Sequence, residues 1–215
     1  MRVLILGATG RIGRLALARA LADGHDVVAL TRHPQAIASV DHLRLVPGDV
    51  TDPTAVSRAV AGVECVLAAI GPHENSADAE RSVELGARNL VAAMEHEGIR
   101  RIVTLSGAAV DSAGDRKPMF DQLASRVVRV FARHVVGAKQ REYEVIAATS
   151  LAWTALRPPL VSDGSARGYR LELNLLPGAR VRRADIADAL VDQLTDSTFL
   201  RQAPFVLPVE PPARR

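Results

Sequence analysis

Short apolar runs rich in β-branched residues alternate along the chain with longer segments in which apolar residues recur at helical spacing. The apolar runs predict strands at 2–6, 26–31, 43–46, 63–70, 102–105, 153–156 and 204–207. The periodic segments predict helices at 11–22, 53–61, 77–97, 120–148 and 184–194. The helix over 120–148 is expected to break near Gly137, and turn residues are expected around 170–175. This alternation predicts an α/β fold with a doubly wound parallel sheet and helices on both faces.

Composition narrows the class of protein. The chain has 215 residues, of which 48% are hydrophobic and 24% are charged, as in soluble globular proteins. No apolar run approaches the roughly 20 residues that cross a bilayer, so we expect neither a membrane span nor a signal peptide. A single cysteine, Cys65, excludes an internal disulfide and a multi-cysteine zinc site. The sequence therefore predicts a cytoplasmic protein without a bound metal.

The charge pattern argues against a nucleic-acid partner. The net charge is +3, and only Lys117 and Lys139 among the 27 basic residues are lysines. The basic residues are scattered and aromatic residues make up only 3% of the chain, so clustered charge and stacking side chains are both missing. We expect a small-molecule ligand instead, and a monomer or weak homodimer.

A glycine-rich loop lies directly between the first predicted strand and the first predicted helix. The first glycine permits a tight turn, the second lets the backbone approach a pyrophosphate, and the third lets the helix pack against the sheet. The helix N-terminus adds free N–H groups and a positive dipole end. The alternative is a packing turn without a ligand. The candidate cofactor-binding residues in this loop are Gly7, Ala8, Thr9, Gly10, Arg11, Ile12 and Gly13.

The end of the second predicted strand indicates which dinucleotide is bound. An acidic residue there accepts from the ribose 2′-OH of NAD, whereas an arginine binds the 2′-phosphate of NADP. This chain has Arg32 and no carboxylate at that position. The residue favours NADP(H), although a solvated surface arginine is the alternative. A single Rossmann-like domain over residues 1–207 is expected, with a small C-terminal extension on the substrate side and a flexible, proline-rich tail over 208–215.

Three further segments carry a family resemblance. They are Gly48-Asp49-Val50, the run Gly86-Ala87-Arg88-Asn89-Leu90-Val91-Ala92-Ala93-Met94, and Trp153-Thr154-Ala155-Leu156-Arg157-Pro158-Pro159. With the glycine loop, they make the chain resemble an atypical short-chain dehydrogenase/reductase of the NAD(P)H-binding, NmrA-like group. It is most similar to the biliverdin reductase B/flavin reductase branch, over nearly the whole chain.

The resemblance implies a role for particular residues. Lys139 stands eighteen residues before Arg157, as the family's lysine does, and is expected to reach the nicotinamide ribose. Ser106 matches the active-site serine, so Ser106 and Lys139 are the candidate catalytic residues. The alternatives are a strand-end cap for the serine and a solvated helical side chain for the lysine. Further cofactor-binding residues are Asp49 and Val50 at the adenine, Ala69, Ile70 and Gly71 beside the nicotinamide ribose, and Pro158 and Leu160 around the nicotinamide; the substrate-side residues are Pro72, His73 and Leu160.

Two departures from the family pattern shape the expected chemistry. Val135 stands four residues before Lys139, where short-chain dehydrogenases place a proton-donating tyrosine. Leu160 replaces the histidine of the biliverdin reductase branch, which makes the pocket more apolar and argues against a tetrapyrrole. The sequence favours an NADPH-dependent oxidoreductase that passes hydride to a flavin, quinone or similar conjugated acceptor. The alternatives are a non-catalytic NADP(H)-sensing protein of NmrA-like type and a biosynthetic epimerase or dehydratase.

Overall fold

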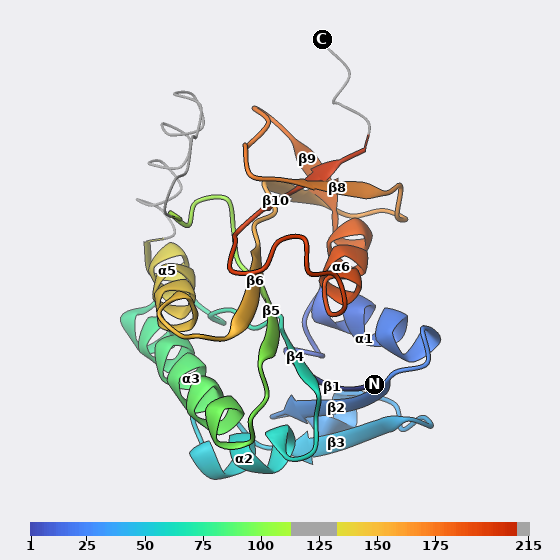
Figure 1. Cartoon of the computed structure of the whole chain (residues 1–215), viewed down its shortest axis with the longest axis vertical. Coiled ribbons are helices and arrows are strands. Elements are labelled where there is room, and N and C mark those ends of the chain that lie inside the picture. The colour runs from blue at the N-terminus through green and yellow to red at the C-terminus, as the bar shows by residue number, and fades with distance from the viewer. Residues whose placement is uncertain (113–132, 210–215) are drawn as a thin grey trace.

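The computed structural model describes residues 1–112 and 133–209 (Figure 1). Its centre is a six-stranded parallel sheet in the order β3-β2-β1-β4-β5-β6. This order, with crossover helices on both faces, is the doubly wound arrangement of a Rossmann fold, so the predicted fold class is confirmed. The strands are β1 (Arg2–Leu6), β2 (Asp26–Thr31), β3 (Leu43–Pro47), β4 (Cys65–Ala68), β5 (Arg101–Leu105) and β6 (Ala152–Leu156).

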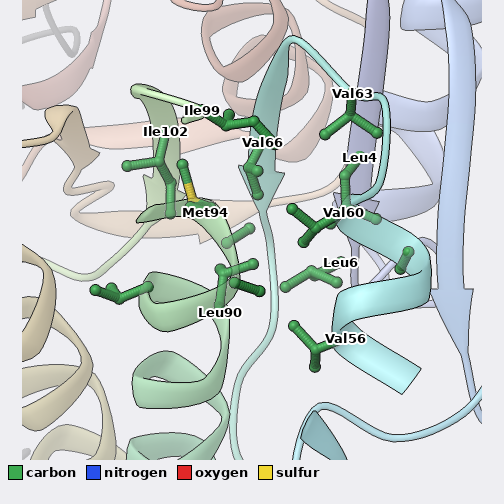
Figure 2. Packing of buried hydrophobic residues seen from close by; sticks show 14 of the residues in the cluster. Leu4, Leu6, Val56, Val60, Val63, Val66, Leu90, Met94, Ile99 and Ile102 are labelled. Atoms are coloured by element: carbon green, nitrogen blue, oxygen red, sulfur yellow. The ribbon is translucent and has the colours of Figure 1, made fainter. Parts of the chain in front are cut away.

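The central strands are almost wholly apolar because the sheet is covered on both faces. Successive side chains of a strand point to opposite faces. In β1, Leu4 and Leu6 contribute to one hydrophobic core, while Val3 and Ile5 contribute to the core on the other face. All four side chains are fully buried. Figure 2 shows Leu4 and Leu6 packed with residues of two helices on the first of these faces.

Helices cover the two faces unequally. Figure 1 shows α3 and α5 on one side of the sheet and α1 and α6 on the other, and α2 joins the core of the first side. Side chains fix where two helices begin: Asp52 accepts a hydrogen bond from the N–H of Thr54, and Ser76 accepts one from the N–H of Ala79. The described helices are α1 (Gly13–Ala22), the 3-10 turn η1 (Pro34–Ala36), α2 (Pro53–Val60), α3 (Ala77–His96), α5 (Arg133–Ala147) and α6 (Arg183–Asp192).

Two small sheets follow the central one in the chain. The strand β7 (Leu160–Ser162) pairs in parallel with β9 (Arg180–Arg182), and β8 (Tyr169–Glu172) pairs antiparallel with β10 (Phe205–Pro208). Figure 1 shows β8, β9 and β10 together at one end of the molecule, beyond α6. The predicted turn around 170–175 is therefore wrong over its first part. The strand β8 is defined by its pairing with β10, which lies more than thirty residues further along the chain, and the local sequence of β8 gives no sign of that pairing.

Other element boundaries also differ from the prediction. The strand β4 covers only Cys65–Ala68, not 63–70, and α1 begins at Gly13 because residues 7–12 form the loop. The predicted break near Gly137 is absent from the described part of α5. A Cβ at Gly137 would come within 2.7 Å of Glu80 Oε1, so this glycine allows the carboxylate of α3 to lie against α5.

Two predictions lie partly outside the described residues. The helix expected over 120–148 falls outside them up to residue 132, and the tail expected over 208–215 falls outside them from residue 210. Pro208 itself is the last residue of β10. Among the described helices, none is both long and apolar enough to cross a membrane.

Candidate active site

The glycine loop lies at the point where the strand order reverses, between β1 and β4. Gly7 has φ +81°, and a Cβ there would come within 2.4 Å of the Ala69 carbonyl oxygen. A Cβ at Gly13 would come within 2.0 Å of the Gly7 carbonyl oxygen. Both collisions are with backbone, which cannot move aside as a flexible side chain can. Packing alone therefore requires glycine at the first and third positions.

Packing alone does not require the second glycine as strictly. Gly10 is exposed, and a Cβ there would meet only the Gly7 oxygen, at 3.1 Å. The Gly10 N–H donates to that oxygen at 2.9 Å, which shapes the turn. The helix α1 begins just beyond, with Ile12 as its N-cap and no acidic residue in its first turn. An exposed backbone without Cβ beside a free helix N-terminus fits a pyrophosphate, so this loop can hold a dinucleotide.

A cavity of about 250 Å³ extends from this loop along the carboxyl ends of the strands. At one end, Arg32 Nε lies 3.6 Å from Asp49 Oδ2. Asp49 Oδ1 accepts from the Thr51 N–H at 2.8 Å and from the Thr51 hydroxyl at 2.7 Å. Partial burial by itself raises the pKa of Asp49, but the hydrogen bonds from Thr51 and the charge of Arg32 outweigh it and lower the pKa below its usual value. The carboxylate is therefore ionised at neutral pH and holds one edge of the guanidinium.

The helix α3 holds the loop after β3 in place. A Cβ at Gly86 would come within 2.6 Å of a methyl group of Val50, so glycine at this position lets α3 approach that side chain. Asn89 Nδ2 donates to the Val50 carbonyl oxygen at 3.0 Å. Both residues belong to the run that carries the family resemblance, but sequence reasoning assigned them no task. Their contacts indicate that they position the wall of the cavity.

A second cavity of about 410 Å³ lies among the loops that follow β5 and β6. Apart from Ser106 and Lys139, its described lining consists of glycine, alanine, valine, proline and leucine. The buried Arg157 ties these loops together: Nε donates to the Ala203 carbonyl at 2.7 Å, and a terminal nitrogen donates to the Val110 carbonyl at 3.1 Å. Its guanidinium also lies 4.0 Å from the ring centroid of Phe205.

Lys139 lies at the junction of the two cavities. Its Nζ donates at 3.0 Å to the carbonyl oxygen of Ile70, which lines the first cavity, while Lys139 itself lines the second. It also contacts the carboxylate of Glu142. Glu142 in turn accepts from the Thr104 hydroxyl at 3.0 Å. Sequence reasoning missed both Glu142 and Thr104, although the three-residue spacing from Lys139 to Glu142 on a helix was a usable signal.

Ser106 follows β5 and also lines the second cavity. It is 9% exposed, and its hydroxyl oxygen is buried without a hydrogen-bond partner among the described residues. Its N–H donates to the Leu156 carbonyl at 2.7 Å, which fixes the backbone but leaves the hydroxyl unused. A buried hydroxyl without a partner costs free energy, and a polar atom of a ligand would offset that cost.

Most of the predicted site residues line one of the two cavities. Ala8 is a buried residue of the glycine loop and lines neither cavity, and Arg11 pairs with Asp163 at 3.2 Å outside both. Pro72 and His73, predicted on the substrate side, line the first cavity and not the second. Ile12 and Gly13 line neither cavity. The other predicted residues line the first cavity (Gly7, Thr9, Gly10, Arg32, Asp49, Val50, Ala69, Ile70, Gly71) or the second (Ser106, Lys139, Pro158, Leu160).

Two residues on either side of Lys139 along α5 occupy different surroundings. Val135 lines the second cavity at the position four residues before Lys139. Tyr143, the tyrosine on the other side of Lys139, does not line that cavity. Its hydroxyl lies 2.8 Å from the Ser112 hydroxyl, and its ring meets Trp153 edge-on with centroids 5.7 Å apart. Tyr143 is therefore a packing residue.

The doubly wound sheet, the glycine loop and the cavity at the strand-order reversal define a dinucleotide-binding Rossmann protein. A family model described as NAD(P)H-binding matches residues 7–197 of the chain. The chain belongs to this NAD(P)H-binding family.

Individual relatives agree with this assignment. The 2-alkyl-3-oxoalkanoate reductase of Stenotrophomonas maltophilia is 32% identical over 176 residues, which are 75% of this chain and 51% of the relative. The chain thus spans about half the length of that curated protein. Among solved structures, ChuY, an anaerobillin reductase from Escherichia coli O157:H7, has a TM-score of 0.79 and 23% identity, with 99% of this chain and 100% of that chain covered.

A short-chain dehydrogenase/reductase from Veillonella parvula, solved in complex with NADP, also has a TM-score of 0.79, at 19% identity. The match covers 97% of this chain and 94% of that one. At these identities, both solved structures establish the fold of the chain and leave its substrate open.

Proposed function

We propose that this protein is an NADPH-dependent reductase that transfers hydride to a neutral, conjugated acceptor such as a quinone or a flavin. The observation that carries the proposal is the position of Lys139. Its Nζ donates to the carbonyl oxygen of Ile70, which lines the first cavity, and its side chain lines the second, apolar cavity. A dinucleotide bound at the glycine loop and an acceptor in the apolar cavity would meet at this side chain. The bound cofactor supplies the hydride.

The preference for NADPH rests on Arg32. Its side chain, just after β2, is 56% exposed, and Asp49 is the carboxylate that pairs with it among the described residues. A planar, permanently charged guanidinium can donate two parallel hydrogen bonds to a 2′-phosphate, and the part of it that faces solvent is accessible to that phosphate. In an NAD-specific site, a carboxylate at this strand end would accept from the ribose 2′-OH instead.

The kind of acceptor follows from the polar groups that the second cavity provides. Lys139 has three N–H donors, two of which are used by Ile70 and Glu142, and the Ser106 hydroxyl has no partner in the described structure. These two groups can orient one carbonyl oxygen of an acceptor. The apolar remainder excludes water and favours a flat, uncharged body.

The missing tyrosine narrows the acceptor further. Reduction of an isolated ketone calls for a proton donor, typically worth roughly 10²- to 10⁴-fold in rate. A conjugated acceptor spreads the added charge and depends mainly on close, oriented contact with the nicotinamide. Val135 at the tyrosine position therefore favours a quinone or flavin over a simple ketone. The reductase names of the Stenotrophomonas and Escherichia coli proteins support hydride transfer in general but not this particular acceptor.

The test measures binding and turnover in one sample. NADPH and NADH are titrated by nicotinamide fluorescence, and oxidation of the bound cofactor is then followed with FMN, FAD, biliverdin, a ketone and quinones of increasing length. Saturable turnover of a quinone or flavin, with little turnover of the ketone, supports the proposal. Tight NADPH binding with no turnover of any acceptor would overturn it and favour a cofactor-sensing protein, and absence of NADPH binding would overturn it outright.

A further inference from the structure

A buried carboxylate, that of Glu142, lies beside the candidate catalytic lysine and lines neither cavity. Glu142 is 1% exposed in the middle of α5. Burial of a charged group is costly unless that group is paired and hydrogen-bonded. Glu142 meets this requirement through two neighbours from different elements, Lys139 on its own helix and Thr104 on β5.

The contacts form a continuous chain through the centre of the molecule. One carboxylate oxygen, Oε1, accepts from the Thr104 hydroxyl at 3.0 Å, and the other, Oε2, contacts Lys139 Nζ. Nζ then donates to the Ile70 carbonyl in the loop after β4, at 3.0 Å. The ammonium is thus held from two sides. One contact comes from Glu142 of α5, which is hydrogen-bonded to β5, and the other comes from the loop after β4.

From this geometry we infer that Glu142, held by Thr104, is the positioning residue for Lys139. A lysine side chain is a flexible four-carbon stem with many rotamers, so a catalytic ammonium must be fixed by neighbours. The carboxylate and the Ile70 carbonyl use two of its three N–H donors and leave one for the cofactor or acceptor. The inference rests on the proposed reductase function, because positioning matters only where Lys139 acts.

A purely structural ion pair is the competing explanation. It would stabilise the contact between α5 and the sheet without affecting the reaction. The two explanations differ in what removal of the charge does: loss of positioning lowers kcat through Lys139 alone, whereas loss of a structural pair lowers the melting temperature and leaves kcat of the folded protein unchanged.

The first experiment is a double-mutant cycle with Glu142→Gln, Lys139→Met and the double variant. Glutamine keeps the shape and can still accept from Thr104 but removes the charge beside Nζ. We expect Glu142→Gln to lower kcat at least about tenfold, the scale of one charge-assisted hydrogen bond, while the KM of the acceptor changes less than threefold. In the Lys139→Met background the same change should have no further effect on kcat.

The matched control is Glu144→Gln, the same chemical change at an exposed position on the same helix, where the carboxylate accepts a hydrogen bond from Gln140 Nε2 at 2.9 Å. This control should keep the wild-type kcat. Thr104→Val gives a second variant in case Glu142→Gln does not fold, and it should lower kcat by a smaller factor. Additive losses of kcat in the double variant would overturn the inference.

A second readout needs neither cofactor nor turnover. Because Lys117 and Lys139 are the only lysines, acetylation of each by acetic anhydride can be resolved by peptide mass spectrometry. Lys139 in the cofactor-free protein should react slowly, because its side chain is only 11% exposed and its ammonium is held by a carboxylate. Its reaction should speed up at least about tenfold in Glu142→Gln and stay unchanged in Glu144→Gln.

The two readouts separate failure of the inference from failure of the proposed function. If the wild-type protein binds NADPH and turns over, but Glu142→Gln matches Glu144→Gln in both kcat and Lys139 labelling, the positioning role alone is wrong. If the wild-type protein shows no turnover with any acceptor, the proposed function fails. Unchanged Lys139 labelling in folded Glu142→Gln then overturns the positioning role as well.

Discussion

The two cavities of this protein are built in opposite ways. The first cavity, of about 250 Å³, is formed at the ends of β1 to β4. Its polar groups come from the backbone, a free helix N-terminus and a few charged side chains. The second cavity, of about 410 Å³, is assembled from the loops after β5 and β6, the start of α5 and the segment around residue 176, and its lining is almost entirely apolar.

The difference reflects two kinds of recognition. A dinucleotide presents a fixed pyrophosphate, which a glycine loop and a helix N-terminus bind with main-chain groups. Side-chain variation alters such a site little. An apolar cavity recognises its ligand by shape and by a few polar groups, so each lining residue changes its selectivity. Substitutions in the first cavity should therefore affect folding or cofactor choice, and those in the second should affect the acceptor.

The largest effect should come from the third glycine of the loop. Gly13→Ala places a methyl group within 2.0 Å of the Gly7 carbonyl oxygen, and the backbone of Gly7 and Ala8 cannot move aside as a side chain can. We expect the free energy of unfolding to fall by about 1–3 kcal/mol or more, as for overpacking of a rigid core. Urea denaturation followed by circular dichroism measures it, with NADPH binding titrated on the folded fraction.

Gly10→Ala is the matched comparison within the same loop. Its new methyl group would meet only the Gly7 oxygen, at 3.1 Å, and otherwise projects where a pyrophosphate is expected. The free energy of unfolding should fall by less than about 1 kcal/mol. NADPH affinity should nevertheless fall at least about tenfold, because the backbone can no longer approach the phosphates closely. Equal losses of stability for both variants would contradict the separate roles of the two glycines.

The second prediction concerns cofactor choice. Arg32→Ala should weaken NADPH binding roughly ten- to hundredfold, the scale of charge-assisted hydrogen bonds to a phosphate, and should change NADH binding less than threefold. Both affinities are measured by fluorescence titration. Arg44→Ala, at an exposed arginine on the neighbouring strand β3, controls for the loss of one positive charge. Equal losses for NADPH and NADH would refute a 2′-phosphate role for Arg32.

The contrast between the cavities also explains what the sequence could predict. The strands β1 and β2 match their predicted ranges because a parallel sheet buried on both faces leaves a continuous apolar run in the local sequence. The glycine loop could be located because its three glycines, the strand and the helix are all within twenty residues. The residues predicted to bind the cofactor at this loop could be named for the same reason.

Features that depend on distant segments escaped prediction. The strand β8 is defined by pairing with β10, and its sequence Tyr-Arg-Leu-Glu between glycine-containing segments looks locally like a turn. Gly137 was interpreted as a helix break, whereas its role depends on Glu80 of another helix. Glu142 and Thr104 are ordinary residues in their own elements, and only the packing of α5 against β5 makes them partners.

The third prediction tests the apolar cavity. Leu160 is 54% exposed at the rim, so Leu160→Asp should leave the fold intact while placing a charge in the lining. We expect the KM of a neutral acceptor to rise about tenfold, since a charged rim is hydrated and disfavours apolar contact, and the NADPH dissociation constant to change less than threefold. Leu173→Asp, at a leucine that is 48% exposed outside the cavity, is the control. Equal effects of the two substitutions on KM would remove Leu160 from the acceptor site.

The smallest effect should be the pH dependence that Asp49 adds to stability. The pKa of Asp49 is lower in the folded protein than its ordinary value, despite partial burial, because Thr51 and Arg32 favour the ionised form. The unfolded chain therefore takes up the proton first as the pH falls, at a pKa near about 3.9. The stabilisation is fully present above that pH and is lost as the pH falls through the lower pKa of the folded state.

Asp49→Asn should thus lower the free energy of unfolding by less than about 1 kcal/mol at pH 7, because solvent screens this half-exposed group. The difference from the wild-type protein should stay constant down to about pH 5 and shrink as the pH falls below about 3.9, where the unfolded chain takes up the proton before the folded protein does. Urea denaturation at several pH values measures it. Thr51→Val, which removes the side-chain donor, should show a smaller difference in the same direction. A difference as large at pH 3 as at pH 7 would mean that the carboxylate acts through its shape and not through its charge.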